Sequence, residues 1–165
     1  EFDIDIRDQN GDTLLIKSIT NGVKKGNVEV TKWLLESGAD VNIQNKKGDT
    51  ALMLCCARIK LGTFYFKLLH LLLQHGADTD IQNRYDYDTV SIICAKHGNF
   101  KCLHLLLEFG TNMNIQNKEG DTALICSVKS CHDECAKLLV HSGADLNIRN
   151  HDGLRAIDFS SSADM

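Results

Sequence analysis

One short phrase of sequence recurs down the chain and constrains its fold more than any other feature. Residues 42–50 read Asn-Ile-Gln-Asn-Lys-Lys-Gly-Asp-Thr, and residues 114–122 read Asn-Ile-Gln-Asn-Lys-Glu-Gly-Asp-Thr. The isoleucine of the phrase stands at positions 6, 43, 81, 115 and 148, so successive copies lie 37, 38, 34 and 33 residues apart. Repetition at such a period predicts a stack of small units, none of which can bury its apolar face alone.

Each unit carries the signals of two short helices and a polar turn. In the clearest unit, residues 117–121 form the turn and Thr122 is a good N-cap for a helix over residues 123–128. A second helix over residues 134–141 is expected to turn Ala136, Leu138, Leu139 and Val140 inward, and Gly143 then suits the left-handed residue that ends a helix. The sequence therefore predicts two antiparallel helices and one projecting turn per unit.

The composition bounds the function. A chain of 165 residues has room for about four to five such units. The net charge of −4 provides no basic footprint for nucleic acid, and the absence of a long apolar run predicts no membrane insertion. The chain has seven cysteines, an odd number, and most of them lie in apolar helical patterns, so we expect reduced thiols. Reduced thiols indicate an intracellular protein, in the cytoplasm or the nucleus. We also expect a monomer.

The units resemble the ankyrin repeat, most clearly over residues 26–42, which read Gly-Asn-Val-Glu-Val-Thr-Lys-Trp-Leu-Leu-Glu-Ser-Gly-Ala-Asp-Val-Asn, and over residues 117–123. The resemblance covers essentially the whole chain. It implies an all-α solenoid with a helix-turn-helix and a β-turn finger in each repeat. We expect a single domain over residues 1–165, with repeats at about 8–44, 45–82, 83–116 and 117–149 and a partial C-terminal cap at 150–165.

The resemblance also implies a protein–protein interaction module that binds a partner protein or peptide through a concave surface of fingers and inner helices. By alignment that surface has a basic bias, which favours an acidic or phosphorylated partner. The predicted partner-binding residues are Lys46, Lys47, Arg58, Arg84, Tyr85, Tyr87, Lys96, His97, Lys118, Glu119 and Lys129.

One finger departs from the others. Residues 83–89 hold one more residue than the equivalent turns, and Tyr85 and Tyr87 stand where the other copies have Lys, Glu, Gly and Asp. Tyrosine and arginine are enriched in binding hot spots, so these rings are candidate contacts. The alternative is that the rings fold back and pack locally over the missing glycine.

Two insertions, near residues 22–25 and 58–62, fall between the helices of the first and second units. They could form a shared positive ridge from Lys24, Lys25, Arg58 and Lys60. The simpler interpretation is that loops tolerate added length at little cost, about 0.6 kcal/mol for each doubling.

No pattern in the sequence indicates chemistry. Residues 131–135, Cys-His-Asp-Glu-Cys, are the densest group of metal-ligand types, but no second Cys or His pair stands at zinc-site spacing. Cys55, Cys56 and Cys94 fall where core residues are expected, without a partner pattern for a nucleophile. We therefore predict no catalytic, cofactor or metal residues and no enzyme activity.

The two ends of the chain are partial units. Residues 3–8 align with the tail of a repeat, and residues 153–159 begin a fifth unit whose Leu154, Ile157 and Phe159 are expected to cap the stack poorly. This favours either a fragment of a longer protein or a protein with an abbreviated C-terminal cap. The alternative function is therefore a substrate-recruiting or targeting segment of a larger multidomain enzyme, ubiquitin-ligase adaptor or effector.

Overall fold

The computed structural model describes residues 3–21, 25–58 and 63–160. Over these residues the secondary structure is entirely helical, with no strand. The helices are α1 (Leu14–Thr20), α2 (Lys25–Glu36), α3 (Ala51–Arg58), α4 (Thr63–Gln74), α5 (Val90–His97), α6 (Phe100–Glu108), α7 (Ala123–Lys129), α8 (Asp133–His141) and α9 (Ala156–Ser160).

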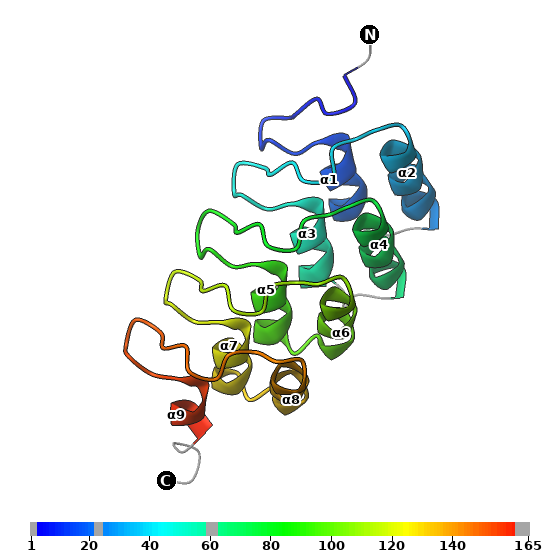
Figure 1. Ribbon diagram of the computed structural model, residues 1–165. Helices are drawn as coiled ribbons and strands as arrows, with labels where there is room; N and C mark the ends of the chain where they lie inside the picture. The colour runs from blue at the N-terminus through cyan, green and yellow to red at the C-terminus, as the bar shows by residue number, and fades with distance from the viewer. Residues whose placement is uncertain (1–2, 22–24, 59–62, 161–165) are drawn as a thin grey trace.

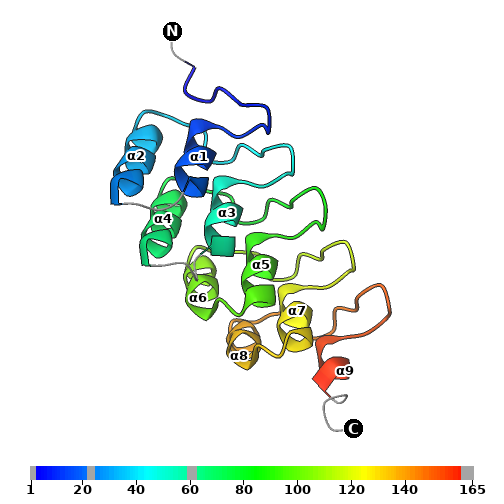
Figure 2. The ribbon, with the colours of Figure 1, turned by 180° about the vertical axis from the view of Figure 1, so that it is seen from behind.

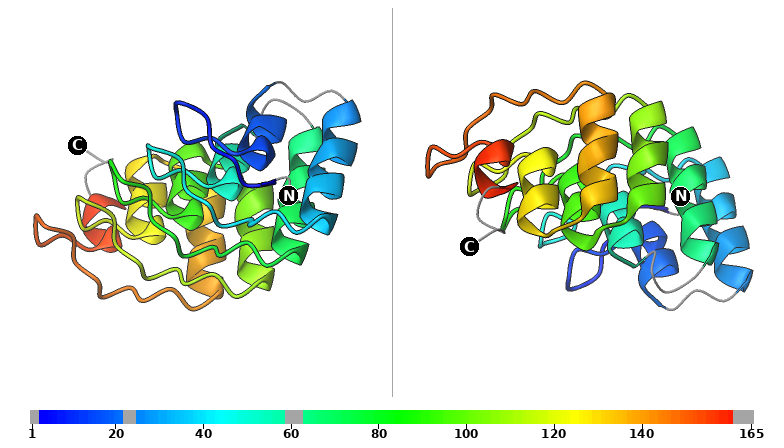
Figure 3. Two further views of the ribbon diagram at one scale, coloured as in Figure 1. Left: turned by 90° about the horizontal axis from the view of Figure 1, so that it is seen from above. Right: turned by 90° about the horizontal axis from the view of Figure 1, so that it is seen from below.

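The helices form two rows, and a third row of loops projects from one side. Helices α1, α3, α5, α7 and α9 make the inner row, and α2, α4, α6 and α8 make the outer row (Figure 1). A long loop, which we call a finger, leads into each inner helix and extends away from the outer row, as the view from behind also shows (Figure 2). Seen along the stack, successive repeats are rotated gradually against one another (Figure 3). The predicted all-α solenoid of helix pairs and fingers is confirmed.

A threonine begins each complete inner helix for the same local reason. The hydroxyls of Thr13, Thr89 and Thr122 accept hydrogen bonds from the backbone N–H three residues later, at 3.3, 3.5 and 3.3 Å. Thr50 does the same for Met53 at 3.3 Å. These bonds satisfy backbone donors that the first turn of a helix leaves unpaired, which is why the finger always ends at this residue.

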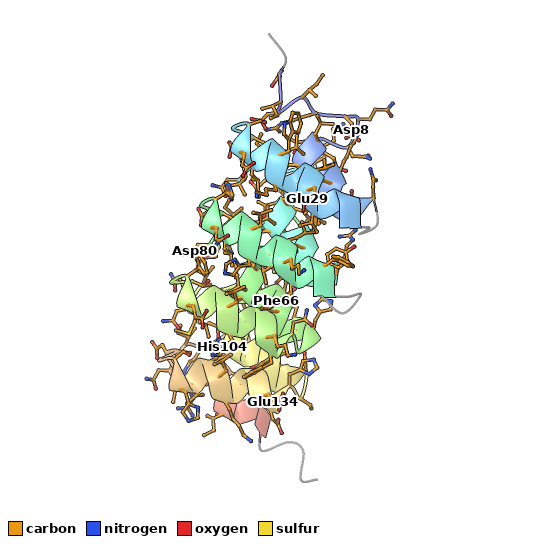
Figure 4. The ribbon with its side chains drawn as sticks, turned by 90° about the vertical axis from the view of Figure 1, so that its right-hand side faces the viewer. Asp8, Glu29, Phe66, Asp80, His104 and Glu134 are labelled. Carbon is orange, nitrogen blue, oxygen red and sulfur yellow. The ribbon has the colours of Figure 1, made fainter. Side chains whose placement is uncertain are left out.

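Leucines of the outer helices fill the space between the two rows. Leu68, Leu69, Leu72, Leu103 and Leu106 are fully buried. The exposed side chains of the outer helices are mixed, since charged residues alternate with apolar ones such as Trp33 and Phe66. Figure 4 shows the outer helices side by side with Glu29, Phe66, His104 and Glu134 on them.

One inward assignment was wrong. Val140 lies at the end of α8 and is 45% exposed, because no outer helix packs beside α8 on its far side within the described residues.

Part of each insertion lengthens an outer helix. Helices α2 and α4 have 12 residues, whereas α6 and α8 have 9. In the repeat register, α2 and α4 each begin about one turn earlier than α6 does. The expectation that the extra residues are all loop is therefore wrong. The ridge that would include Lys24 and Lys60 lies outside the described residues.

The glutamine of the recurring phrase joins each finger to the next. Gln44 Nε2 donates to the Gly48 carbonyl at 2.6 Å in its own finger and to the Gln82 carbonyl at 2.9 Å in the next one. Gln116 makes the same pair of bonds, to Gly120 at 2.6 Å and Arg149 at 2.9 Å. The phrase is thus a repeated inter-repeat connector, which explains its preservation in the most regular units.

Candidate partner-binding surface

The tips of the fingers form a continuous row. The backbone N–H of Lys46 donates to Asn10 at 2.9 Å, that of Arg84 to Lys47 at 3.0 Å, and that of Lys118 to Asp86 at 2.8 Å. Because each tip is bonded to the preceding one, their side chains are held in a fixed order. The predicted binding residues on this fingertip row are Lys46, Lys47, Arg84, Tyr85, Tyr87, Lys118 and Glu119.

The third finger presents two exposed aromatic rings. Tyr85 is 62% exposed and Tyr87 is 51% exposed, so both residues keep a large part of their surface open to solvent. The extra residue is accommodated within the tip, where Asn83 N–H bonds to the Asp88 carbonyl across five residues rather than the four that separate Asn45 from Asp49.

The backbone of Tyr87 occupies a region that glycine normally fills. Its φ is 55°, whereas Gly48 and Gly120 occupy the equivalent turns with φ of 81° and 77°. A left-handed conformation costs a residue with a Cβ about 1–2 kcal/mol. The third finger therefore keeps a tyrosine where a glycine would be less strained.

Two of the predicted cations on the inner helices are already paired. Lys96 Nζ lies 2.7 and 2.9 Å from the carboxylate oxygens of Asp88, and Lys129 Nζ lies 2.6 Å from Asp121. Both aspartates are buried. Partial burial alone would lower the pKa of Lys96, but the Asp88 carboxylate outweighs it, so this pKa lies above its usual value. Hydrogen bonding to Asp121 likewise raises the pKa of Lys129. These lysines therefore stabilise the stack rather than offering free charge.

The structure does bring three predicted residues together. Lys96, Glu119 and Lys129 line a shallow hollow of about 210 Å³ between α5, α7 and the fourth finger. Asp121 also lines it, so its charges are largely compensated inside the protein. The hollow therefore has little net positive charge with which to attract an anion.

The last two predicted residues bond to their own helices. Arg58 Nη1 donates to the Leu54 carbonyl at 3.1 Å, and His97 Nδ1 lies 2.8 Å from the Ile93 carbonyl. His97 keeps an exposed ring near the end of α5, whereas Arg58 is half-buried.

The fingertip row carries four cations that are outside the ion pairs of the described residues. Among the residues that the structure describes, Lys46, Lys47, Arg84 and Lys118 form no ion pair within 4 Å. The two tyrosines lie among these four cations.

Asp49 occupies the same finger position as Asp88 but has no side-chain donor to its carboxylate among the described residues. Burial raises its pKa, against the opposing charges of Lys47 and Arg58. The pKa of Asp49 is therefore higher in the folded chain than in the unfolded chain. The folded state loses stability as the pH rises from the unfolded-state pKa through the folded-state pKa, because the buried carboxylate becomes charged. We therefore expect Asp49→Asn to raise the melting temperature at pH 7, and the gain to vanish at pH values below the ordinary aspartate pKa of 3.8. A melting temperature that falls at pH 7 in thermal scans would contradict this.

The Cys-His-Asp-Glu-Cys segment has a structural role. The His132 ring lies against Gly98 of the previous repeat and its Nε2 is 3.2 Å from the Lys96 carbonyl. Cys135 is buried while Cys131 is exposed, so their side chains lie in different environments.

Sequence reasoning missed a different cluster. Cys56, Cys94 and Cys102 come from three helices, and their sulfur atoms all lie within 4.8 Å of one another. No motif spacing connects them, because they meet only when the second and third repeats stack. An alignment of the repeats by their capping threonines places Cys56 six residues after Thr50 and Cys94 five residues after Thr89. This near-equivalence on neighbouring inner helices was the signal that could have brought the two cysteines together.

Apolar surface is exposed at the C-terminal end of the described stack. A groove of about 430 Å³ runs between α7, α8 and α9, lined by Leu124, Val128, Val140, Leu146 and Ile157 among others. Ile157 is 65% exposed, in line with the expectation that this partial unit covers the stack poorly.

The described helices are all too short or too polar to cross a membrane.

The fold and its fingers define a helical repeat protein, and the comparisons identify the family. A model described as ankyrin repeats (3 copies) matches residues 1–83 and 59–150, so the chain belongs to the ankyrin repeat family. Ankyrin repeats generally serve as protein–protein interaction modules and are typically non-catalytic scaffolds.

Solved structures give the same result. An ankyrin repeat domain from Acinetobacter baumannii AYE is 29% identical, with a TM-score of 0.85 over 98% of this chain and 80% of that one. The ankyrin repeat protein EF0377 is 30% identical, with a TM-score of 0.83 over 98% of this chain and 80% of its own. A search of curated proteins found no match.

Proposed function

We propose that this protein binds an acidic peptide segment of a partner protein along its fingertip row, in an intracellular compartment. The observation that carries the proposal is Tyr87, an exposed aromatic residue held in a left-handed backbone conformation. A glycine would relieve the strain at this position, and about half of the tyrosine is exposed. This suggests that the side chain is retained for a contact with a partner.

The charge distribution supports the same surface. Lys46, Lys47, Arg84 and Lys118 lie on consecutive fingers joined by backbone hydrogen bonds, and the same fingers also carry the carboxylates of Asp49, Asp86 and Glu119. An extended acidic segment crossing the fingers could pair with these cations and cover both tyrosine rings. Tyrosine gives large contact area at low entropic cost, so the rings would provide most of the affinity and the cations the steering. The buried free thiols of the core fit a reducing compartment.

The outer face is a weaker candidate. Its ion pairs, Lys32–Glu36 and His104–Glu108, join neighbouring turns of the same helix and have side chains more than half exposed. Such pairs contribute little and mark a solvated surface.

The proposal is tested by a double variant, Tyr85→Ala with Tyr87→Gly. Capture from a lysate by the wild-type chain, followed by quantitative mass spectrometry, identifies partners, and titration of an acidic peptide from one of them measures affinity. We expect the variant to bind that peptide about 2 kcal/mol more weakly, roughly thirtyfold, while its melting temperature does not fall. Because glycine relieves the backbone strain at position 87, the variant should not unfold more easily, and weaker binding can then be attributed to the lost rings.

Phe66→Ala is the matched control, because Phe66 is an exposed aromatic residue on α4 in the outer row (Figure 4). It should leave the affinity unchanged. Equal loss in the control and the double variant would place the contact elsewhere. If the affinity does not weaken with added salt, the proposal that the partner segment is acidic is wrong.

A further inference from the structure

Three buried thiols meet between the second and third repeats. Cys56 lies on α3, Cys94 on α5 and Cys102 on α6, and their sulfur atoms are within 4.8 Å of one another. Their exposed fractions are 0, 0 and 1%. All three are free thiols, so the cluster holds three potential sulfur ligands in a dry environment.

Comparison of equivalent positions, counted from the capping threonine of each repeat, shows that the position of Cys94 does not require a cysteine. Ser18 and Ser127 stand at the register of Cys94 in the first and fourth repeats, and each hydroxyl donates to the carbonyl three residues earlier, at 2.7 and 2.8 Å. Cys55 has the register of Cys94 in the second repeat, yet it lies outside the cluster and donates to the Tyr65 carbonyl instead. Within the described part of the chain, three sulfurs meet only at this junction.

The spacing suits a small three-coordinate ion. The sulfur atoms lie no more than 4.8 Å apart, and three sulfurs bonded at about 2.3 Å to a pyramidal ion with bond angles of about 100° lie about 3.5 Å apart, so each thiol must move inward by about 0.7 Å or less. Side-chain rotation within the existing helices can supply such a movement.

Charge decides which ion fits. Zinc in closed protein sites takes four ligands, and among the described residues only these three sulfur atoms come together. A monovalent copper ion on three thiolates would leave a net charge of −2 in a buried core, where unpaired charge is costly. A trivalent ion on three thiolates is neutral. We propose that Cys56, Cys94 and Cys102 form a binding site for a trivalent ion of the arsenic group, which takes three sulfur ligands and no fourth.

The reaction with arsenous acid balances without an oxidant or a reductant. Three S–H bonds and three As–O bonds break, three As–S bonds form, and the three thiol protons leave with the hydroxides as three waters. The bound ion would cross-link α3, α5 and α6 and so fasten the second repeat to the third.

Access requires the two repeats to separate briefly, because the sulfurs are covered. Repeats contact only their neighbours, which makes local opening at one junction feasible. Binding should therefore be slow compared with the reaction of the exposed Cys131.

The test uses sodium arsenite and the full chain, with a phosphine to keep the thiols reduced. Native mass spectrometry counts bound arsenic, and thermal melting reports stabilisation. Cys94→Ser removes one ligand and copies the residue that two other repeats already use at this register. Cys55→Ser is the matched control in the neighbouring repeat.

We expect one slowly bound arsenic per wild-type chain, a higher melting temperature with arsenite, and at least a tenfold loss of affinity in Cys94→Ser but not in Cys55→Ser. X-ray absorption at the arsenic edge of the wild-type adduct should show three sulfur neighbours and no oxygen, whether or not a variant folds. No adduct, equal affinity in Cys94→Ser, two sulfurs with one oxygen, or tighter retention of copper(I) than of arsenic would each overturn the proposal.

Discussion

Gly48→Ala is expected to lower the free energy of unfolding by about 3 kcal/mol, because a Cβ at this position meets the next finger. Gly48 has φ of +81°, and a Cβ there would lie 2.5 Å from the backbone nitrogen of Arg84. That nitrogen donates to Lys47 at 3.0 Å, so relief of the clash must stretch the bond that joins the second finger to the third. Left-handed strain contributes about 1–2 kcal/mol and the weakened bond about 1 kcal/mol more.

Gly38→Ala separates the two causes. Gly38 has φ of +90° with nothing within 4 Å of the built Cβ, so it carries the strain without the clash. We expect a loss of only about 1 kcal/mol in this control. Urea unfolding followed by circular dichroism measures both variants, and for a chain of this length 3 kcal/mol corresponds to a fall of about 6–12 °C in melting temperature. Equal losses would show that the close approach of the fingers contributes nothing.

Asp88→Ala is expected to lower the free energy of unfolding by about 3 kcal/mol, because the Asp88 carboxylate accepts three hydrogen bonds from two residues of neighbouring repeats. Its carboxylate accepts two bonds from Lys96, at 2.7 and 2.9 Å, and one from Asn117 Nδ2 at 3.0 Å. Lys96 is about one-third exposed and can recover water, so its pairing contributes only part of the total. Asn117 is buried, and the loss of its partner leaves an amide donor unsatisfied at a cost of about 1–3 kcal/mol.

Asp12→Ala is the register-matched control for Asp88→Ala. Asp12 accepts a side-chain bond only from Asn45, at 2.9 Å, among the described residues, and is less buried. It should lose about 1 kcal/mol. Asn45 is buried like Asn117, so the two variants differ in the Lys96 ion pair and in the burial of the aspartate itself. If both variants unfold at the same urea concentration, neither of these differences contributes to stability.

Features that depend on contacts within a single repeat can be predicted from the sequence. Thr122 caps α7 as expected, and Gly143 ends α8 with φ of 88°, because both effects act within a few residues. The fate of the insertions was harder to predict, since an added turn on α2 and an added loop fit the same spacing. The availability of Lys96 and Lys129 could not be predicted, because it depends on where the finger carboxylates lie relative to the inner helices.

By itself, the sequence determined the repeat, the order of fingers and helices, and the exceptional third finger with its two tyrosines. These depend on local backbone preferences that recur with the period. Tertiary structure alone decided that Gly48 lies under Arg84, that Asp88 binds both Lys96 and Asn117, and that Cys56, Cys94 and Cys102 converge. Each of these contacts joins different elements of the stack, so it depends on the translation and rotation between packed helices, which no single repeat encodes.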